Sequence, residues 1–213
     1  MYTLSLAPPA RLTAFIVLAL ALGCARAPET CPGGTAPDED GARALIARLA
    51  STPEGEGVVR RLGSQAPRVC VGRVPVSAVT TDGTILLDAA LDEAEAAARL
   101  GHLLVHVVEG LPGAASAGGA AAGGCDAEVA RALAAEARAL ALELRLRRAL
   151  GVRAPRLRYE LEGDFWEAEP GAREGLILGY LAAHPGGGPG IDAIAEGYAR
   201  RCRERERPEG GAR

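Results

Sequence analysis

The strand-forming residues of this chain are concentrated in one stretch, residues 68–88, and this limits the possible folds more than any other feature. β-branched valines recur there, and Asp82-Gly83 is a preferred two-residue turn of β-hairpins. We therefore expect a hairpin in which Val76–Thr81 pairs with Thr84–Leu87. Because helical patterns occupy most of the remaining sequence, the chain is predicted to have an α+β fold that is mainly helical.

Apolar spacing and capping residues predict the helices. Thr52 followed by Pro53 starts one helix, and Asp92 with Glu95 three residues later starts another as a variant of the capping box. Glycines are expected to end several of them. The expected ranges are about 42–50, 53–62, 92–108, 126–150, 171–183 and 190–204, with a loop over 111–124 and irregular chain over 152–170.

The N-terminus carries the pattern of an export signal. Arg11 precedes an apolar run over residues 12–22, which is too short to span a bilayer. The run ends in ALGC, which resembles the lipobox of bacterial lipoproteins, where the chain is cut before a cysteine that is then acylated; here that residue is Cys24. The alternative is an ordinary secretory signal that happens to contain a cysteine.

These features divide the chain into four parts. Residues 1–23 are predicted as a lipoprotein signal peptide and residues 24–41, rich in Pro and Gly, as a flexible tether. We expect one domain over residues 42–206 and a disordered tail over 207–213. Acylated Cys24 would anchor the chain in a membrane. The residue after it is not the aspartate that retains some lipoproteins at the inner membrane, so we expect the outer membrane, on its periplasmic face.

Four further cysteines suggest an oxidising compartment. They are expected to form two disulfides, for which three pairings are possible, and no C-x-x-C pair is present. The four candidates are Cys31, Cys70, Cys125 and Cys202. The net charge is −3, so nucleic-acid binding through bulk electrostatics is not expected.

One group of residues in the sequence carries recognisable chemistry. His102 and His106 lie four residues apart on a predicted helix, and two imidazoles at this spacing can bind one zinc ion. Glu136 falls in the apolar stripe of the next helix, where an unpaired carboxylate is unfavourable, and it is the expected third ligand. Two alternatives are that the histidines are hydrogen-bonded core residues without a metal, and that Glu136 pairs with Arg147.

The order of these elements and motifs resembles that of the gluzincin metallopeptidases, and is closest to their minimal-core members. The stretch RLGHLLVHVVEG matches the family motif H-E-x-x-H at His102 and His106, and AAEARAL matches the third-ligand segment at Glu136. The resemblance covers roughly residues 42–151. It implies a zincin-like fold, a zinc ion, and peptide binding by strand addition along an edge strand, here Thr84–Leu87.

The chain departs from that family at the residue after the first histidine. The family has a glutamate there, which takes a proton from zinc-bound water, whereas this chain has Leu103. We therefore expect a zincin-like domain that binds a protein or peptide partner without catalysis. The alternatives are a zinc-dependent peptidase or amidase in which Glu95 or Glu109 acts as the base, and a purely structural envelope lipoprotein.

Overall fold

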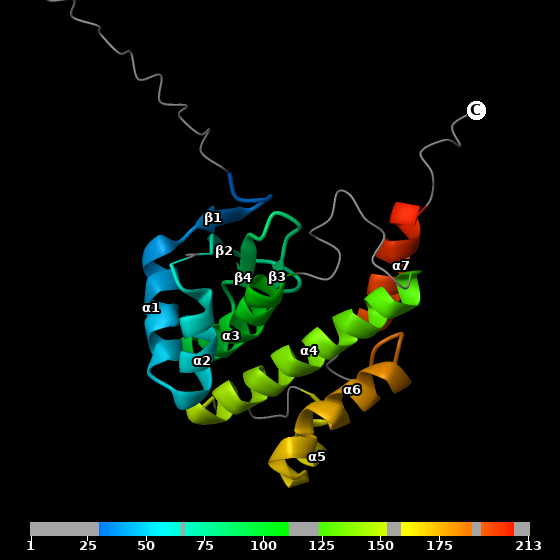
Figure 1. Cartoon of the computed structure of the whole chain (residues 1–213). Helices are drawn as coiled ribbons and strands as arrows, with labels where there is room; N and C mark the ends of the chain where they lie inside the picture. Colours follow the sequence, from blue (N-terminus) through cyan, green and yellow to red (C-terminus); the bar gives the residue numbers. More distant parts are fainter. Residues whose placement is uncertain (1–29, 65–66, 111–123, 153–158, 189–192, 207–213) are drawn as a thin grey trace, which may run out of the picture.

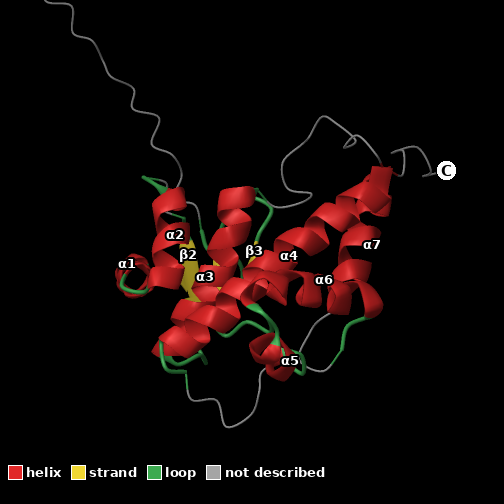
Figure 2. Cartoon of the chain, turned by 60° about the horizontal axis from the view of Figure 1, so that its bottom comes forward, coloured by secondary structure: helices red, strands yellow, loops and turns green. Residues whose placement is uncertain are grey.

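The computed structural model describes residues 30–64, 67–110, 124–152, 159–188 and 193–206. Over these residues the fold is α+β and mainly helical, as predicted, and Figure 2 shows how little of it is strand. The elements, labelled in Figure 1, are β1 (Thr35–Pro37), α1 (Glu39–Ala50), α2 (Pro53–Leu62), β2 (Val69–Gly72), β3 (Ala78–Val79), β4 (Ile85–Asp88), α3 (Glu93–Glu109), α4 (Gly124–Ala149), α5 (Glu162–Glu167), a short 3-10 helix (Pro170–Ala172), α6 (Arg173–Ala183) and α7 (Ile194–Glu206).

The strands form one mixed sheet with the order β1-β2-β4-β3. β4 pairs with β3 in an antiparallel hairpin, as predicted, with Ala78 opposite Leu86 and Val79 opposite Ile85. The predicted two-residue turn is wrong, because this register brings Thr80 opposite Thr84 and leaves residues 81–83 in the turn. Along its other side β4 pairs in parallel with β2. The expectation that Thr84–Leu87 is an edge strand is therefore wrong, because β4 lies inside the sheet and β3 forms the edge.

The domain begins earlier than its composition suggests. Residues 35–37 belong to the predicted tether, yet they form β1, which pairs antiparallel with β2. A disulfide between Cys31 and Cys70 fastens this segment to β2, and α1 already starts at Glu39. The C-terminal part of the predicted tether over residues 24–41 is thus a structured part of the domain.

The helix boundaries follow the capping residues. Thr52 caps α2 and Asp92 caps α3, each by accepting a hydrogen bond from the backbone amide three residues later. A glycine with positive φ follows each of α2, α3 and α4, where a side chain would be strained; these are Gly63, Gly110 and Gly151. The predicted starts and ends of these helices are confirmed to within about two residues.

Part of the stretch over residues 152–170 is helical, which corrects the expectation of irregular chain. α5 places Phe165 fully inside the core beside α4 and α6. Trp166 next to it lies against the guanidinium groups of Arg148 and Arg173, whose central carbons are 4.6 and 5.0 Å from the ring centre. A helix of six residues is too short to be recognised by apolar periodicity.

α4 crosses the molecule and separates two hydrophobic clusters (Figure 1). One cluster packs α3 against the sheet, α1 and α2, and the other packs the far side of α4 against α5, α6 and α7. Gly101 of α3 lies so close to α4 that an added Cβ would collide with Leu146. This close approach brings the facing side chains of α3 and α4 into direct contact.

The second disulfide joins Cys125 at the start of α4 to Cys202 in α7. The expectation of two disulfides is therefore confirmed, and the pairing is the one of the three possibilities that joins neighbours in the sequence order of the four cysteines. Cys24 with the predicted signal peptide, most of the loop after α3, and the tail over 207–213 lie outside the described residues.

None of the helices in the described ranges combines the length and the hydropathy of a membrane span.

Candidate metal centre

Polar side chains follow the contact between α3 and α4 through an otherwise apolar interior. These side chains form pairs between the two helices. Pairs nearer to the C-terminus of α3 lie nearer to the N-terminus of α4, so the two helices run antiparallel. The pairs are Glu95–Arg147 at 3.1 Å, Arg99–Glu143 at 3.2 Å and His106–Glu136 at 3.4 Å. We call these six residues, together with His102, the polar seam.

Three potential ligand atoms meet within the polar seam. Nε2 of His102 lies 3.2 Å from Nε2 of His106 and 3.5 Å from Oε2 of Glu136, and Nε2 of His106 lies 3.4 Å from that same oxygen. The three residues are buried, with exposed fractions of 5%, 4% and 8%. The predicted residues therefore do form one group that can hold a metal ion.

These distances match one face of a tetrahedral zinc site. When the ligand atoms of a regular tetrahedron lie about 2.0–2.1 Å from the metal, they are about 3.3–3.4 Å from one another. The three observed edges of 3.2, 3.4 and 3.5 Å lie around that value. Ring nitrogens and a carboxylate oxygen this close also repel one another through their lone pairs unless protons or a cation lie between them.

Two of the three ligand residues contact a further side chain on the side away from the ligand atoms. Nδ1 of His102 lies 3.1 Å from Oε2 of Glu143, and a carboxylate in this position orients a metal-binding imidazole and increases its basicity. Tyr198 of α7 donates a hydrogen bond of 3.0 Å to Oε1 of Glu136, which leaves Oε2 directed at the histidines. Neither His102 nor His106 forms a hydrogen bond through Nδ1 among the described residues. The contact of His102 with Glu143 is therefore an ion pair, and His106 has no such contact at Nδ1.

Glu143 is a fully buried carboxylate, with 0% of the residue exposed. The hydroxyl of Tyr159 donates a hydrogen bond of 3.0 Å to its Oε1, and Nη1 of Arg99 lies 3.2 Å from its Oε2. A charge at this depth is tolerated only with such partners. Glu143 therefore connects His102 to a cationic side chain and a phenol in the interior.

The buried groups shift one another's pKa values. Burial alone lowers the pKa of His102, but hydrogen bonds and the negative charges of Glu136 and Glu143 outweigh it and raise that pKa above its ordinary value. Burial alone raises the pKa of Glu136, but the two histidines lower it well below its usual range. Burial also raises the pKa of the Tyr198 phenol, which stays neutral and can donate. These shifts favour the anionic form of Glu136 and the protonated form of His102, so a metal ion would compete with a proton for His102.

The other residues considered for the site have different partners. Arg147 pairs with Glu95 rather than with Glu136, which corrects that alternative. Glu109 is bound through both carboxylate oxygens by Arg138, at distances between 2.6 and 3.2 Å. Leu103 is 3% exposed and packs in the cluster around α3. Glu95 and Glu109, the two alternatives for the missing general base, are therefore both paired with arginines and not with the three ligand atoms.

The sequence does not single out Glu143, Tyr198, Tyr159 or Arg99. A signal for Glu143 exists, because it follows Glu136 by two helical turns and falls on nearly the same face of α4. The contribution of Tyr198 depends on how α7 docks against α4, and no local pattern reports that. The same holds for Tyr159, which follows α4 in an irregular stretch.

A second group of possible ligands consists of Cys125, Cys202 and Glu206. Its two sulfur atoms are bonded to each other in the disulfide. Since only free thiolates bind metal ions, the group around His102 is the one of these two groups, among the residues that the structure describes, whose ligand atoms are available.

Comparison with models of protein families, with curated proteins and with solved structures found no match.

Proposed function

We propose that this chain is a lipid-anchored envelope protein whose domain is a zincin-like zinc-binding module that works by binding and not by hydrolysis. The observation that carries the proposal is the near-equilateral group formed by Nε2 of His102, Nε2 of His106 and Oε2 of Glu136, with edges of 3.2–3.5 Å. Two imidazoles and a carboxylate are a donor set well suited to zinc.

Each residue of the site has a separate part in this proposal. His102, His106 and Glu136 would hold the ion, while Glu143 and Tyr198 orient the side chains of two of these ligands. A zinc ion held by these three residues would supply a Lewis acid to a bound molecule. Leu103 cannot accept a proton, so the position next to the first histidine offers no general base.

The proposed partner is a protein or peptide in extended conformation. β3 is the edge of the sheet on the side away from β1, and it lies against α3. The backbone groups of such an edge can pair with an added strand. β3 therefore replaces Thr84–Leu87 as the strand to which we assign this interaction.

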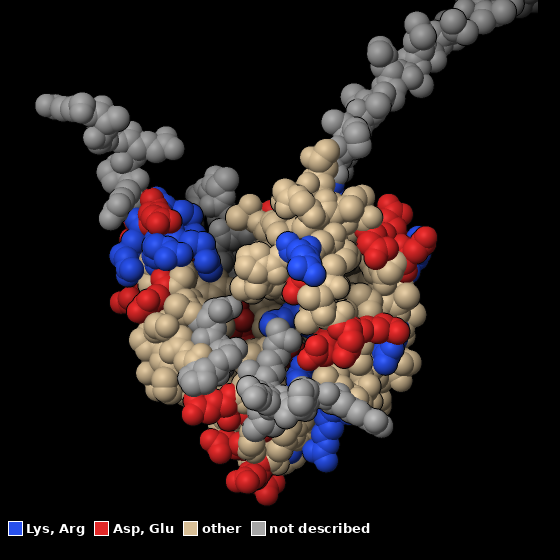
Figure 3. All heavy atoms as spheres, turned by 180° about the vertical axis from the view of Figure 1, so that it is seen from behind, with Lys and Arg blue, Asp and Glu red and all other residues tan. Residues whose placement is uncertain are grey.

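The surface charge supports a protein or peptide partner over nucleic acid. On the face seen in Figure 3, acidic and basic side chains of the described residues are interspersed, and arginines gather only toward the end of α7 beside glutamates. The net charge of the chain is −3. A nucleic-acid surface normally presents a continuous basic patch.

The zinc-loaded protein should not cleave peptides. We expect a mixed peptide library to give no new termini by mass spectrometry after incubation with the full chain and one equivalent of zinc. His102→Ala serves as the control for contaminating proteases. Zinc-dependent cleavage that disappears in His102→Ala would overturn the binding proposal in favour of a peptidase or amidase.

Glu143→Gln should weaken zinc binding by about 10–100-fold, as is typical when an outer partner of a metal ligand is lost. The amide keeps the shape of the side chain but loses the charge that orients His102. Competition with a chromophoric chelator measures the affinity. Glu93→Gln, on α3 and paired with Arg48 at the surface, should leave it unchanged. Equal affinities in both variants would show that Glu143 does not support the site.

Cys24→Ser should abolish incorporation of labelled fatty acid and release the protein from the membrane fraction, because two acyl chains are what would hold it there. Cys31→Ser is the matched control, since Cys31 is bonded to Cys70 and should not affect labelling. A Cys24→Ser protein that remains labelled and membrane-bound would contradict the anchor. Absence of label from the unmodified protein would favour an ordinary secretory signal.

A further inference from the structure

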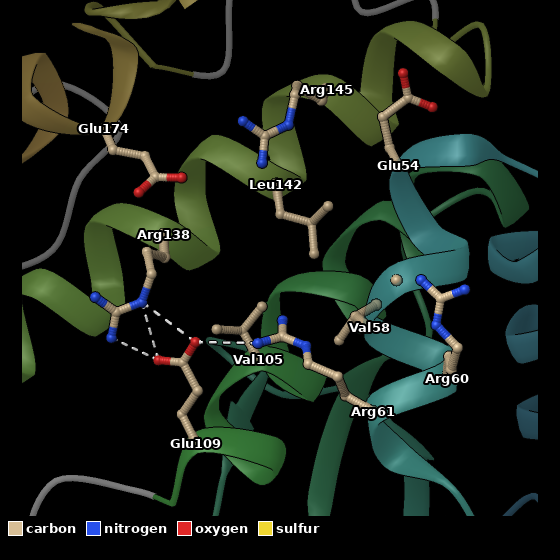
Figure 4. A pocket seen from close by; sticks show the side chains of 11 residues that line it. Glu54, Val58, Arg60, Arg61, Val105, Glu109, Arg138, Leu142, Arg145 and Glu174 are labelled. Carbon is tan, nitrogen blue, oxygen red and sulfur yellow. Dashed lines mark hydrogen bonds and ion pairs between the residues drawn. The ribbon is translucent and has the colours of Figure 1, made fainter. Parts of the chain in front are cut away.

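A charged cavity lies between α2 and α4, separate from the metal centre (Figure 4). Its volume is about 360 Å³, within the range of small-molecule binding sites. Its walls come from α2, α3 and α4, and Glu174 of α6 lies at one end. It includes none of the three ligand residues and none of the side chains that orient them, so its chemistry has to be considered on its own.

The floor of the cavity is apolar. It is formed by Val58, Val105 and Leu142, one from each of the three helices, which are otherwise members of the core. Figure 4 shows the side chain of Leu142 projecting into the space between α4 and α2. Such a floor favours the apolar part of a ligand, because contact removes apolar surface from water.

The charges above this floor are unevenly distributed. Four arginines and three glutamates line the cavity. Glu109 forms ion pairs with two of the arginines. Its Oε2 lies 2.6 Å from Nη2 of Arg138, and its Oε1 lies 3.6 Å from Nη1 of Arg61. Arg145 forms no hydrogen bond or ion pair with another described residue, and Figure 4 shows its guanidinium turned into the cavity from α4.

The remaining charged residues lie at the ends of the cavity. Glu54 and Glu174 are far apart in Figure 4, on opposite sides of Arg145. Arg60 is paired with Glu56 at 3.5 Å, on the exposed side of α2. With Arg60 offset by Glu56, three arginines and three glutamates remain in the lining. The positive charge is therefore concentrated in the middle of the cavity, where Arg61, Arg138 and Arg145 lie with Glu109 beside the apolar floor.

We propose that this cavity binds an amphipathic organic anion, namely a carboxylate joined to an unbranched apolar chain. The carboxylate would lie between Arg145 and Arg61, because guanidinium groups bind carboxylates through paired N–H donors. The chain would lie over Val58, Val105 and Leu142. The two sites share no residue, so we expect the anion to bind in the absence of zinc.

Isothermal titration of the full chain with decanoate tests the proposal. We expect decanoate to bind, while decylammonium, with the opposite charge, and acetate, without the chain, do not bind at the same concentrations. Arg145→Gln should weaken decanoate binding by about tenfold or more, as expected for the loss of a charge-assisted hydrogen bond. Arg131→Gln, an exposed arginine on α4 outside the cavity, should not change it.

A second variant tests the location independently of charge. Gly57 of α2 lines the cavity and has open space around its Cα, so Gly57→Leu should fill the cavity and block decanoate, while leucine favours the helix more than glycine does. The proposal is overturned if decanoate fails to bind or binds no better than decylammonium. It is equally overturned if neither Arg145→Gln nor Gly57→Leu weakens decanoate binding.

Discussion

His106→Ala is expected to lower the affinity for zinc by more than about 100-fold, because the loss of an outer partner alone typically costs 10–100-fold. His106 is the ligand best suited to this test. Its Nδ1 has no partner among the described residues, whereas His102 also contacts Glu143. Removing His106 therefore leaves the pairing of Glu143 with Arg99 and Tyr159 in place.

The matched control for this variant is His184→Ala. His184 is the third histidine of the chain, exposed at the end of α6, where its ring contacts the carbonyl of Tyr180. Zinc titration with a competing chelator, with circular dichroism to verify folding, should show full affinity in His184→Ala and strongly reduced affinity in His106→Ala. If both proteins bind zinc as the parent does, the metal is held elsewhere.

Removing the disulfide between α4 and α7 should have the largest effect on stability. The Cys125→Ser, Cys202→Ser double variant opens a link between residues 77 apart, and loss of a native disulfide typically lowers the free energy of unfolding by about 2–5 kcal/mol. The same variant should weaken zinc binding, because α7 carries the Tyr198 that orients Glu136.

The other disulfide provides the comparison. A Cys31→Ser, Cys70→Ser variant opens a link between residues 39 apart, so it should be destabilised as well, but its zinc affinity should remain that of the parent because β1 contributes nothing to the site. Urea unfolding measures the stability and chelator competition measures the affinity. Unchanged zinc affinity in the Cys125→Ser, Cys202→Ser variant, when folded, would argue against a role for α7.

The local features of this fold were predictable because they depend on neighbouring residues. Thr52 and Asp92 cap their helices as expected. Asp82-Gly83 lies in the turn between β3 and β4, although that turn is one residue longer than predicted. The position of β4 inside the sheet was not predictable in the same way. It results from parallel pairing with β2, and a strand that pairs on one or on both sides can have the same sequence pattern.

The metal centre was predictable only in part. The spacing of His102 and His106 and the placement of Glu136 in an apolar stripe predict the three residues that meet. The partners of those residues come from tertiary contacts, since Tyr198 is 62 positions away from Glu136 in the chain. Similarly, β1 lies in a segment whose Pro and Gly content is typical of a tether, and it becomes a strand through its pairing with β2.

The metal content and zinc-edge X-ray absorption spectrum of the full chain, purified in the presence of zinc and then dialysed, test the central claim most directly. We predict one zinc ion per chain, with nitrogen and oxygen neighbours at about 2.0–2.1 Å, and loss of that signal in His106→Ala. A protein that retains no zinc after dialysis would contradict the claim. So would sulfur neighbours at about 2.3 Å, because the ion would then be held by cysteines and not by His102, His106 and Glu136.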